Sequence, residues 1–265
     1  MIVEWLTRLL TPASREARRL GYLDEAIAIQ ARYRRVAASW QSHLENSQGV
    51  IVQSAATCQQ RQRVAVLGSG LLLDIPLHTL LREFGEVHLV DIAHPRSVQK
   101  LATQHPAIHL HTHDVTGIAA GLVRIKNAHH AALPEPHATL PPIKGGVDML
   151  ISANLLSQLT VVPLAHLYRC GFEDTAPLNA WCREIVADHL AMLRAQAARV
   201  CLISDTVQSV VDEEGRILRS RNMVHGMPLG ESEKSWNWML APRGEMLKTA
   251  EIRAHVFAFP DYRSN

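Results

Sequence analysis

The sequence predicts an α/β protein in which a mostly parallel sheet carries helices on both faces. Three short apolar runs, at 64–67, 87–90 and 108–113, alternate with two helix-like segments at 74–84 and 95–104. Strands that alternate with helices in this rhythm pair in parallel, because each helix returns the chain to the same end of the sheet.

The composition is that of a folded globular protein. Hydrophobic residues make up 47% of the 265 residues and the formal net charge is +2, which excludes extensive disorder and a global field that attracts nucleic acid or an anionic membrane. No apolar stretch approaches the roughly 20 residues needed to cross a bilayer. The four cysteines are scattered and form no CxxC motif, so we expect a reduced, cytoplasmic protein without membrane association.

Residues 1–57 are expected to form a helical N-terminal cap. Apolar side chains recur from Leu23 to Leu44 at helical spacings, which places them on one face that needs a partner. Seven arginines oppose four acidic residues through Arg35. A solvated helix face is the ordinary interpretation of this pattern. A cap that attracts an acidic substrate to an active site is the alternative.

Residues 58–265 are assigned to the sheet domain, with a proline- and histidine-rich insertion at about 126–146. The last two strands have no helix-length segment between them, so they must run antiparallel. The elements after the insertion are expected as strand 147–152, a helix from Asn154, helix 181–198, strand 199–204, a hairpin-like pair at 207–211 and 217–218, and strands 236–240 and 252–259.

A glycine turn, Gly68-Ser69-Gly70, joins the first strand to a helix. Glycines let the backbone approach a ligand closely, and a helix N-terminus offers N–H groups to an anion. A phosphate-binding P-loop is excluded because its lysine is missing. A dinucleotide site is disfavoured, because Leu73 replaces the third glycine and Asp74 would repel a diphosphate.

Acidic residues follow the next two strands. Asp91 stands 21 residues after Gly70, where its carboxylate can accept hydrogen bonds from both ribose hydroxyls. Asp114, followed by Val115, stands where it can accept from an adenine amino group. S-adenosylmethionine combines an adenosine with low negative charge and suits these groups. The segment 64–114 resembles the class I S-adenosylmethionine-dependent methyltransferases, in motif order and in the chemistry of each strand end.

The resemblance covers about residues 60–260. It implies a Rossmann-like, seven-stranded sheet closed by an antiparallel C-terminal hairpin. It also implies that the element 148–154 ends beside the transferred methyl group, which places Asn154 there.

Two positions depart from the family pattern. Val66 stands where the family usually has an acidic residue, and Leu72 stands at the usual third glycine. Asp74 is therefore expected to help anchor the methionine part, a role compatible with its ordinary one as a helix N-cap.

The site residues follow from these assignments. The cofactor is expected to contact Gly68, Ser69, Gly70, Asp74, Asp91, Asp114, Val115 and Asn154. Turn formation is the ordinary role of the two strand-end aspartates. Substrate-binding residues are expected at Tyr33, Gln158 and Trp236, although core packing or solvent exposure is the commoner fate of such side chains.

His225, in a segment that could fold over the pocket, is the candidate general base. His109, His111 and His113 alternate along the third strand in a zinc-like spacing, but polar side chains are normal on an edge strand. We expect no metal.

These observations favour a methyltransferase that acts on a small molecule. A non-catalytic protein that senses S-adenosylmethionine or supports a partner is the second hypothesis, and an NAD-dependent dehydrogenase is the third. A nucleic-acid substrate is not favoured, and the sequence leaves the methyl acceptor and the oligomeric state open.

Overall fold

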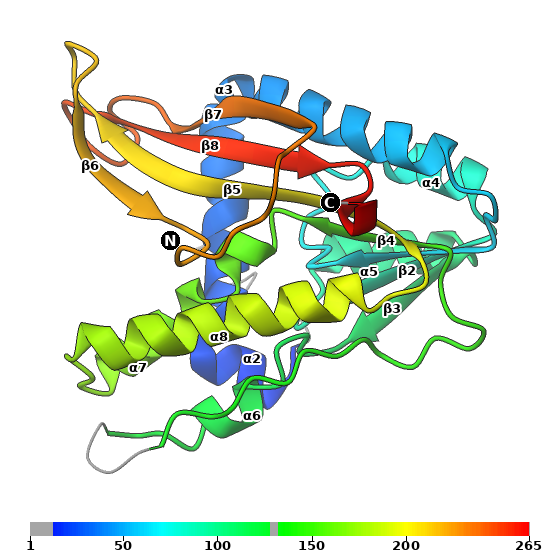
Figure 1. The fold of residues 1–265 in the computed structure, drawn as a ribbon, viewed down its shortest axis with the longest axis horizontal. Coiled ribbons are helices and arrows are strands. Elements are labelled where there is room, and N and C mark those ends of the chain that lie inside the picture. Colours follow the sequence, from blue (N-terminus) through cyan, green and yellow to red (C-terminus); the bar gives the residue numbers. More distant parts are fainter. Residues whose placement is uncertain (1–12, 128–131, 265) are drawn as a thin grey trace.

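The computed structural model describes residues 13–127 and 132–264. Within them the sheet has eight strands, seven of them in the order β3-β2-β1-β4-β5-β8-β7, with β6 paired to β5 (Figure 1). The predicted mostly parallel sheet is confirmed, with one strand more than expected. The strands are β1 Arg63–Leu67, β2 Glu86–Asp91, β3 Ile108–Thr112, β4 Met149–Ala153, β5 Arg199–Val211, β6 Ile217–Asn222, β7 Lys234–Ala241 and β8 Glu251–Phe259.

The parallel half of the sheet is built around β1. Val64 pairs with Val87 of β2 on one side and with Met149 of β4 on the other, and β3 and β5 extend the sheet outwards. The connections leave β1 toward β2 and later return to β4 on its opposite side. A crevice forms beyond the carboxyl ends of the strands at such a switch in strand order, which makes this edge the expected ligand site.

The antiparallel half is more extensive than the sequence indicated. β5 continues without interruption to Val211, because its second half pairs with β6 on one side and with β8 on the other. The hairpin-like pair therefore belongs to the main sheet and supplies its eighth strand. The antiparallel pairing of β7 with β8 confirms the predicted C-terminal hairpin.

Helices cover both faces of the sheet. Figure 1 shows α3 on one side and α7 with α8 on the other. Side chains alternate accordingly along β1, where Val64 and Val66 join the cluster beneath α3, and Ala65 and Leu67 join the other. The helices are α2 Arg15–Leu20, α3 Tyr22–Ala56, α4 Leu77–Glu83, α5 Arg96–Gln104, α6 Ala119–Leu122, α7 Val161–Arg169 and α8 Thr175–Arg194, with short 3-10 turns η1 Leu156–Gln158 and η2 Tyr262–Ser264.

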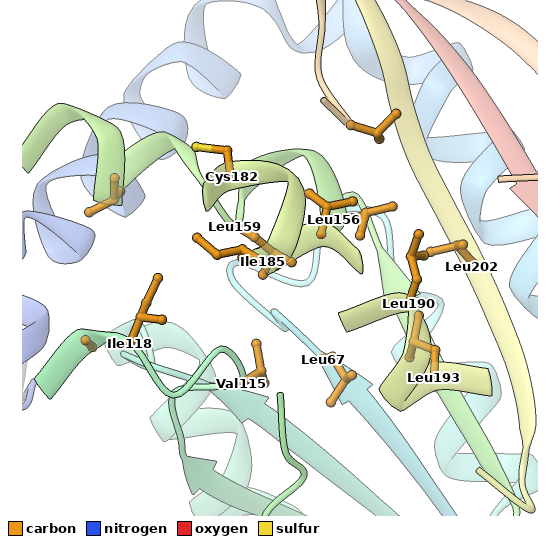
Figure 2. Packing of buried hydrophobic residues seen from close by; sticks show 14 of the residues in the cluster. Leu67, Val115, Ile118, Leu156, Leu159, Cys182, Ile185, Leu190, Leu193 and Leu202 are labelled. Carbon is orange, nitrogen blue, oxygen red and sulfur yellow. The ribbon is translucent and has the colours of Figure 1, made fainter. Parts of the chain in front are cut away.

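The larger cluster lies between the sheet and α8. Figure 2 shows Ile185, Leu190 and Leu193 of α8 directed toward the strands that carry Leu67 and Leu202. All five side chains are buried. This packing fixes the height of α8 above the sheet and leaves the carboxyl edge of the strands to other elements.

In the segment expected to form the helical cap, the described residues contain α2 and α3, and residues 1–12 lie outside the described residues. α2 and α3 meet at Gly21, whose φ of 101° ends one helix and starts the next. Non-helical dihedral angles at Val36 kink α3. The part beyond the kink packs against β7 and the neighbouring strands, so the apolar stripe faces the sheet from Val36 to Leu44.

Two predicted helix starts are wrong. α4 begins at Leu77 after Pro76, so Asp74 is not its N-cap; the Asp74 side chain binds Asn154 instead. Asn154 does not start a helix, because its N–H donates to Ile203 O at 2.7 Å and so continues the sheet ladder. Its φ of 53° then turns the chain away. Asn154 and Gln158 therefore do not share the face of one helix.

The insertion at 126–146 has no helix or strand in its described part, and residues 128–131 lie outside the described residues. It is nevertheless attached to the domain. His137 N–H donates to Thr116 O at 2.9 Å, and the Trp181 indole donates to Pro134 O at 2.8 Å. Among the described helices, none combines the length and the apolar character that a bilayer span requires.

Candidate functional site

A cavity of about 410 Å³ opens at the carboxyl edge of the parallel strands. The ends of β1 to β5 contribute one side, and α3 with β7 contributes the other. Of the predicted site residues, all eight assigned to the cofactor line this cavity, as does Gln158. Residues that are far apart in sequence are thus brought together where the strand order predicts a ligand site.

The glycine turn forms the floor of the cavity. Gly68 has a φ of 64°, and a Cβ atom there would lie 2.7 Å from Leu155 Cδ1. The N–H groups of Gly68 and Ser69 donate to Val90 O, and Gly70 N–H donates to Asp91 Oδ2 at 2.7 Å. These three donors are therefore used within the protein. The turn brings its backbone to the cavity wall without free N–H groups at Gly68, Ser69 or Gly70.

Asp91 lies beside this turn. Its Oδ2 accepts from Gly70 and its Oδ1 accepts from Ala93 N–H at 3.2 Å. Burial raises the pKa of this carboxyl, partly opposed by hydrogen bonds from the backbone, the first of them from Gly70. Each oxygen of a carboxylate has capacity for a second hydrogen bond. Asp91 can therefore accept from a diol in the cavity while it holds the glycine turn.

Asp114 is occupied by its own turn. Its Oδ1 accepts from Thr116 N–H at 3.0 Å and from the Thr116 hydroxyl at 2.6 Å, and its Oδ2 accepts from Ala119 N–H at 2.7 Å. These contacts order the turn before α6 and place Val115 and Thr116 in the cavity wall. The structural role foreseen as the alternative for Asp114 is thus present in the contacts.

Tyr22 of α3 closes this end of the cavity. Burial raises the pKa of its phenol, and the charges of Asp114 and Asp91 add to the effect. The three side chains therefore lie near one another. Tyr22 was not among the residues predicted from the sequence, because nothing in its local sequence shows that the first turn of α3 faces two strand ends.

A polar chain crosses the middle of the cavity wall. Asn154 Nδ2 donates to Asp74 Oδ2 at 2.7 Å and lies 3.1 Å from His43 Nε2. Trp236 Nε1 donates to His43 Nδ1 at 3.1 Å, and the imidazole stacks on Trp238 at a centroid distance of 3.9 Å. Burial lowers the pKa of His43 to about 3 and raises the pKa of Asp74. His43 is therefore neutral at physiological pH.

A neutral imidazole has one donor nitrogen and one acceptor nitrogen. Because His43 accepts from Trp236 through Nδ1, its proton is on Nε2, where it faces another donor, Asn154 Nδ2, so the 3.1 Å contact between these two nitrogens is not a hydrogen bond in this tautomer. Asn154 Oδ1 is buried and has no hydrogen-bond partner. A buried acceptor without a partner costs about 1–3 kcal/mol, so a ligand that donates to this oxygen would be stabilised.

The far end of the cavity is lined by Asp205, Gln208 and Arg221, opposite an apolar wall that includes Trp40 and Trp238. Asp205 is 3% exposed. Asp205 was not among the residues predicted from the sequence, although an acidic residue inside the apolar run of β5 was a usable signal. His43 gave a weaker signal, since a histidine on an apolar helix face is usually a core residue.

Three predicted residues lie outside the cavity wall. Tyr33 packs near Trp40 at a ring-centroid distance of 5.9 Å, and Trp236 supports His43 from behind. His225 Nε2 lies 2.9 Å from the Thr160 hydroxyl, and burial lowers the pKa of this imidazole. None of the three is among the residues that line the cavity.

The histidines of β3 pair with β2. His88 Nδ1 lies 2.9 Å from His111 Nε2, and His88 Nε2 lies 3.0 Å from Glu86 Oε2. Within residues 13–127 and 132–264, no group of three or more His, Cys, Asp or Glu side chains is arranged to hold a metal ion.

No protein-family model matches the chain, and no curated protein matches its sequence. Solved structures do match. The DhpI–SAM–HEP complex has 11% identity and a TM-score of 0.37, and the match covers 92% of this chain and 99% of that one. N-methyltransferase NodS from Bradyrhizobium japonicum WM9, with S-adenosyl-L-homocysteine, has 11% identity and a TM-score of 0.35 over 82% and 87% of the two chains.

The 1,6-didemethyltoxoflavin-N1-methyltransferase of Burkholderia thailandensis, with bound 1,6-didemethyltoxoflavin and S-adenosylhomocysteine, has 12% identity and a TM-score of 0.34 over 89% of each chain. The chain's own strand order, with its antiparallel C-terminal hairpin, defines a mostly parallel, Rossmann-like sheet.

Proposed function

We propose that the chain is an S-adenosylmethionine-dependent methyltransferase with a small-molecule acceptor. The observation that carries the proposal is the placement of Asp91 against the glycine turn, at the switch point of the sheet and inside the cavity. A carboxylate at this strand end is suited to a ribose diol, and the nearby acidic groups disfavour a diphosphate.

The cavity offers a place for each part of the cofactor. Asp91 receives the ribose hydroxyls, and Val115 with Tyr22 encloses the adenine. The amino-acid part extends along Gly68–Gly70 toward Asp74 and Asn154, where an ammonium group can donate to the unpartnered Asn154 Oδ1. Asp114 contributes mainly by shaping the turn that carries Val115.

S-adenosylmethionine supplies a methyl group already activated on a sulfonium. The chain needs no nucleophile of its own; it must align the acceptor with the methyl group and exclude water. The Trp40 and Trp238 side chains exclude water from the acceptor end, and Asn154 marks the junction between the two ends.

The test is calorimetry of the purified chain with S-adenosylmethionine, S-adenosylhomocysteine and NAD. We expect both sulfur compounds to bind. Asp91→Asn and Asp91→Ala are expected to weaken binding by about 10- to 100-fold, the value of hydrogen bonds to a charged group. Glu184→Gln removes the same charge from an exposed position of α8 and is expected to bind normally. Binding of NAD alone would overturn the proposal.

A non-catalytic protein that binds S-adenosylmethionine is the second candidate. The position of His225 outside the cavity wall favours it, because the base expected from the sequence is then not at the site. Turnover of labelled cofactor with cell extract distinguishes the two: transfer of label to a small molecule supports the enzyme, and tight binding without transfer supports the sensor.

A further inference from the structure

Asp205 is a buried carboxylate at the acceptor end of the cavity, and its surroundings define a substrate class. It lies just beyond the parallel part of β5, where Ile203 pairs with Ala153. Asn154 N–H donates to Ile203 O. Asp205 and Asn154 therefore lie beyond the paired parts of two neighbouring strands, at the same edge of the sheet.

A β-bulge directs this part of β5. The pairing with β8 passes from Asp205 opposite Val256 to Val207 opposite His255, which leaves Thr206 as the extra residue. An extra residue re-aims the side chains around it, and bulges recur beside functional sites for this reason. The Thr206 hydroxyl donates to His255 O at 3.1 Å and fixes the bulge.

Two neutral donors hold the carboxylate. The Ser157 hydroxyl donates to Oδ1, and Gln208 Nε2 donates to Oδ2 at 2.8 Å. Ser157 lies three residues after Asn154 and is itself buried, so its hydrogen bond ties Asp205 to the loop that carries Asn154. The carboxylate is thus oriented from both sides and retains further acceptor capacity.

No cation neutralises Asp205 in the part of the chain that the structure describes. Among the described residues, no ion pair joins Asp205 to a lysine, arginine or histidine. Arg221 lines the same cavity, but its charge acts on His225 and Cys182. Burial raises the pKa of Asp205, and only neutral hydrogen bonds oppose that effect. A buried carboxylate of this kind favours a ligand that brings a positive charge or N–H donors.

We infer that Asp205 receives the amino group of the methyl acceptor, so the substrate is an amine with an apolar body and the reaction is N-methylation. The inference rests on the proposed function and deepens it. Trp40, Leu240 and Ile252 form the apolar wall that faces the body of the amine.

The same carboxylate completes the proton balance. The bound ammonium passes one proton to Asp205, which leaves a neutral amine with a free electron pair and a carboxylic acid. The electron pair forms the N–CH3 bond as the C–S bond breaks, and the electrons of that bond remain on sulfur. The product leaves as a methylated ammonium, and Asp205 returns its proton to solvent. Burial of Asp205 supports this step, because it makes the neutral acid accessible.

The experiment compares probes that differ only in the head group, on protein saturated with S-adenosylhomocysteine. Tryptamine, tryptophol and indole-3-propionate form one matched set, and phenethylamine, 2-phenylethanol and 3-phenylpropionate form another. We expect at least one amine to bind about 10-fold or more tightly than its alcohol and acid counterparts. Equal binding within both sets, preference for the acids, or no binding by either amine would overturn the inference.

Asp205→Asn keeps the shape and removes the charge, so the preference for amines should fall to within about 3-fold, below the value of one charge-assisted hydrogen bond. Asp205→Glu should retain the preference, as should the control Glu184→Gln. If Asp205→Asn does not fold, the comparison of the matched probes on the unmodified chain still decides. Binding of S-adenosylhomocysteine is measured first: its absence contradicts the proposed function, whereas its presence without a preference for amines contradicts only the role of Asp205.

Discussion

Gly68 carries the tightest steric constraint of the glycine turn. Its positive φ excludes a side chain on conformational grounds, and a Cβ atom would also lie 3.1 Å or less from three atoms of Leu155. Leu155 directly follows Asn154, so any side chain at position 68 pushes on the loop that carries the central polar group of the cavity. Close packing transmits such a displacement because the loop has no room to yield.

We therefore expect Gly68→Ala to weaken binding of S-adenosylhomocysteine by at least about 10-fold, as a misplaced Asn154 and floor would each remove contacts. Gly146→Ala is the matched control: φ is 71° there, and no heavy atom lies within 4 Å of its added Cβ. Both variants should lose about 1–2 kcal/mol of stability from the left-handed conformation. Calorimetry and urea unfolding measure the two effects, and equal affinities for the two variants would contradict this account of the turn.

At the scale of elements, α3 is joined to β7 by a hydrogen bond to the carbonyl of Leu240, a residue that a β-bulge leaves out of the strand pairing. The pairing of β7 with β8 passes from Met239 to Ala241 and leaves Leu240 out of the ladder. Trp40 Nε1 donates to Leu240 O at 3.0 Å, and the Trp40 ring meets Trp238 edge-on at 5.0 Å. Arg35 pairs with Glu245 farther along the same contact. The wall of the cavity therefore depends on this junction.

Trp40→Phe keeps an aromatic ring and removes the donor to Leu240 O. We expect a loss of about 0.5–1.5 kcal/mol of unfolding free energy, because a part-buried hydrogen bond is lost. Tyr168→Phe, at a residue 52% exposed on α7, should change stability by less than about 0.5 kcal/mol. Urea unfolding compares the two variants, and equal stability of Trp40→Phe and the unmodified chain would show that the junction contributes nothing.

For the whole molecule, two buried histidines couple stability to pH. His43 is 2% exposed and His189 is fully buried, and burial lowers their pKa values to about 3 and about 4. Below the ordinary histidine pKa of about 6.5, these two histidines bind protons in the unfolded chain but stay neutral in the folded chain. Stability is therefore lost as the pH falls from about 6.5 toward 4, by about 1.4 kcal/mol per unit for each histidine.

Asp74 and Asp205 act in the opposite direction, because their raised pKa values favour the folded state as the pH falls toward the ordinary aspartate value of about 4. A difference between variants isolates the histidine effect. Between pH 6.5 and 5, His189→Gln should lose about 2 kcal/mol less than the unmodified chain. His78→Gln, at an exposed position of α4, should follow the unmodified chain. Unfolding by urea at several pH values measures this, and parallel profiles for His189→Gln would contradict it.

The sequence by itself determined the alternation of strands and helices, the glycine turn and the antiparallel hairpin, and the structure confirms these features of the fold. Each depends on residues that are close in sequence. Runs of β-branched residues predict strands, glycines predict the turn, and the last connection is too short for a parallel crossover. The strand-end aspartates were placed correctly at the cavity for the same reason, since parallel strands end at a common edge. Their cofactor roles stay predictions.

Only the tertiary structure decided what faces the cavity. Asp74 was expected to cap a helix and instead holds Asn154, because a partner 80 residues away competes for its carboxylate. His43 meets Asn154 across 111 residues, and Asp205 reaches the acceptor end through a bulge that depends on pairing with β8. Local pattern fixes backbone conformation through neighbouring residues, whereas the composition of a cavity depends on long-range packing that no local pattern specifies.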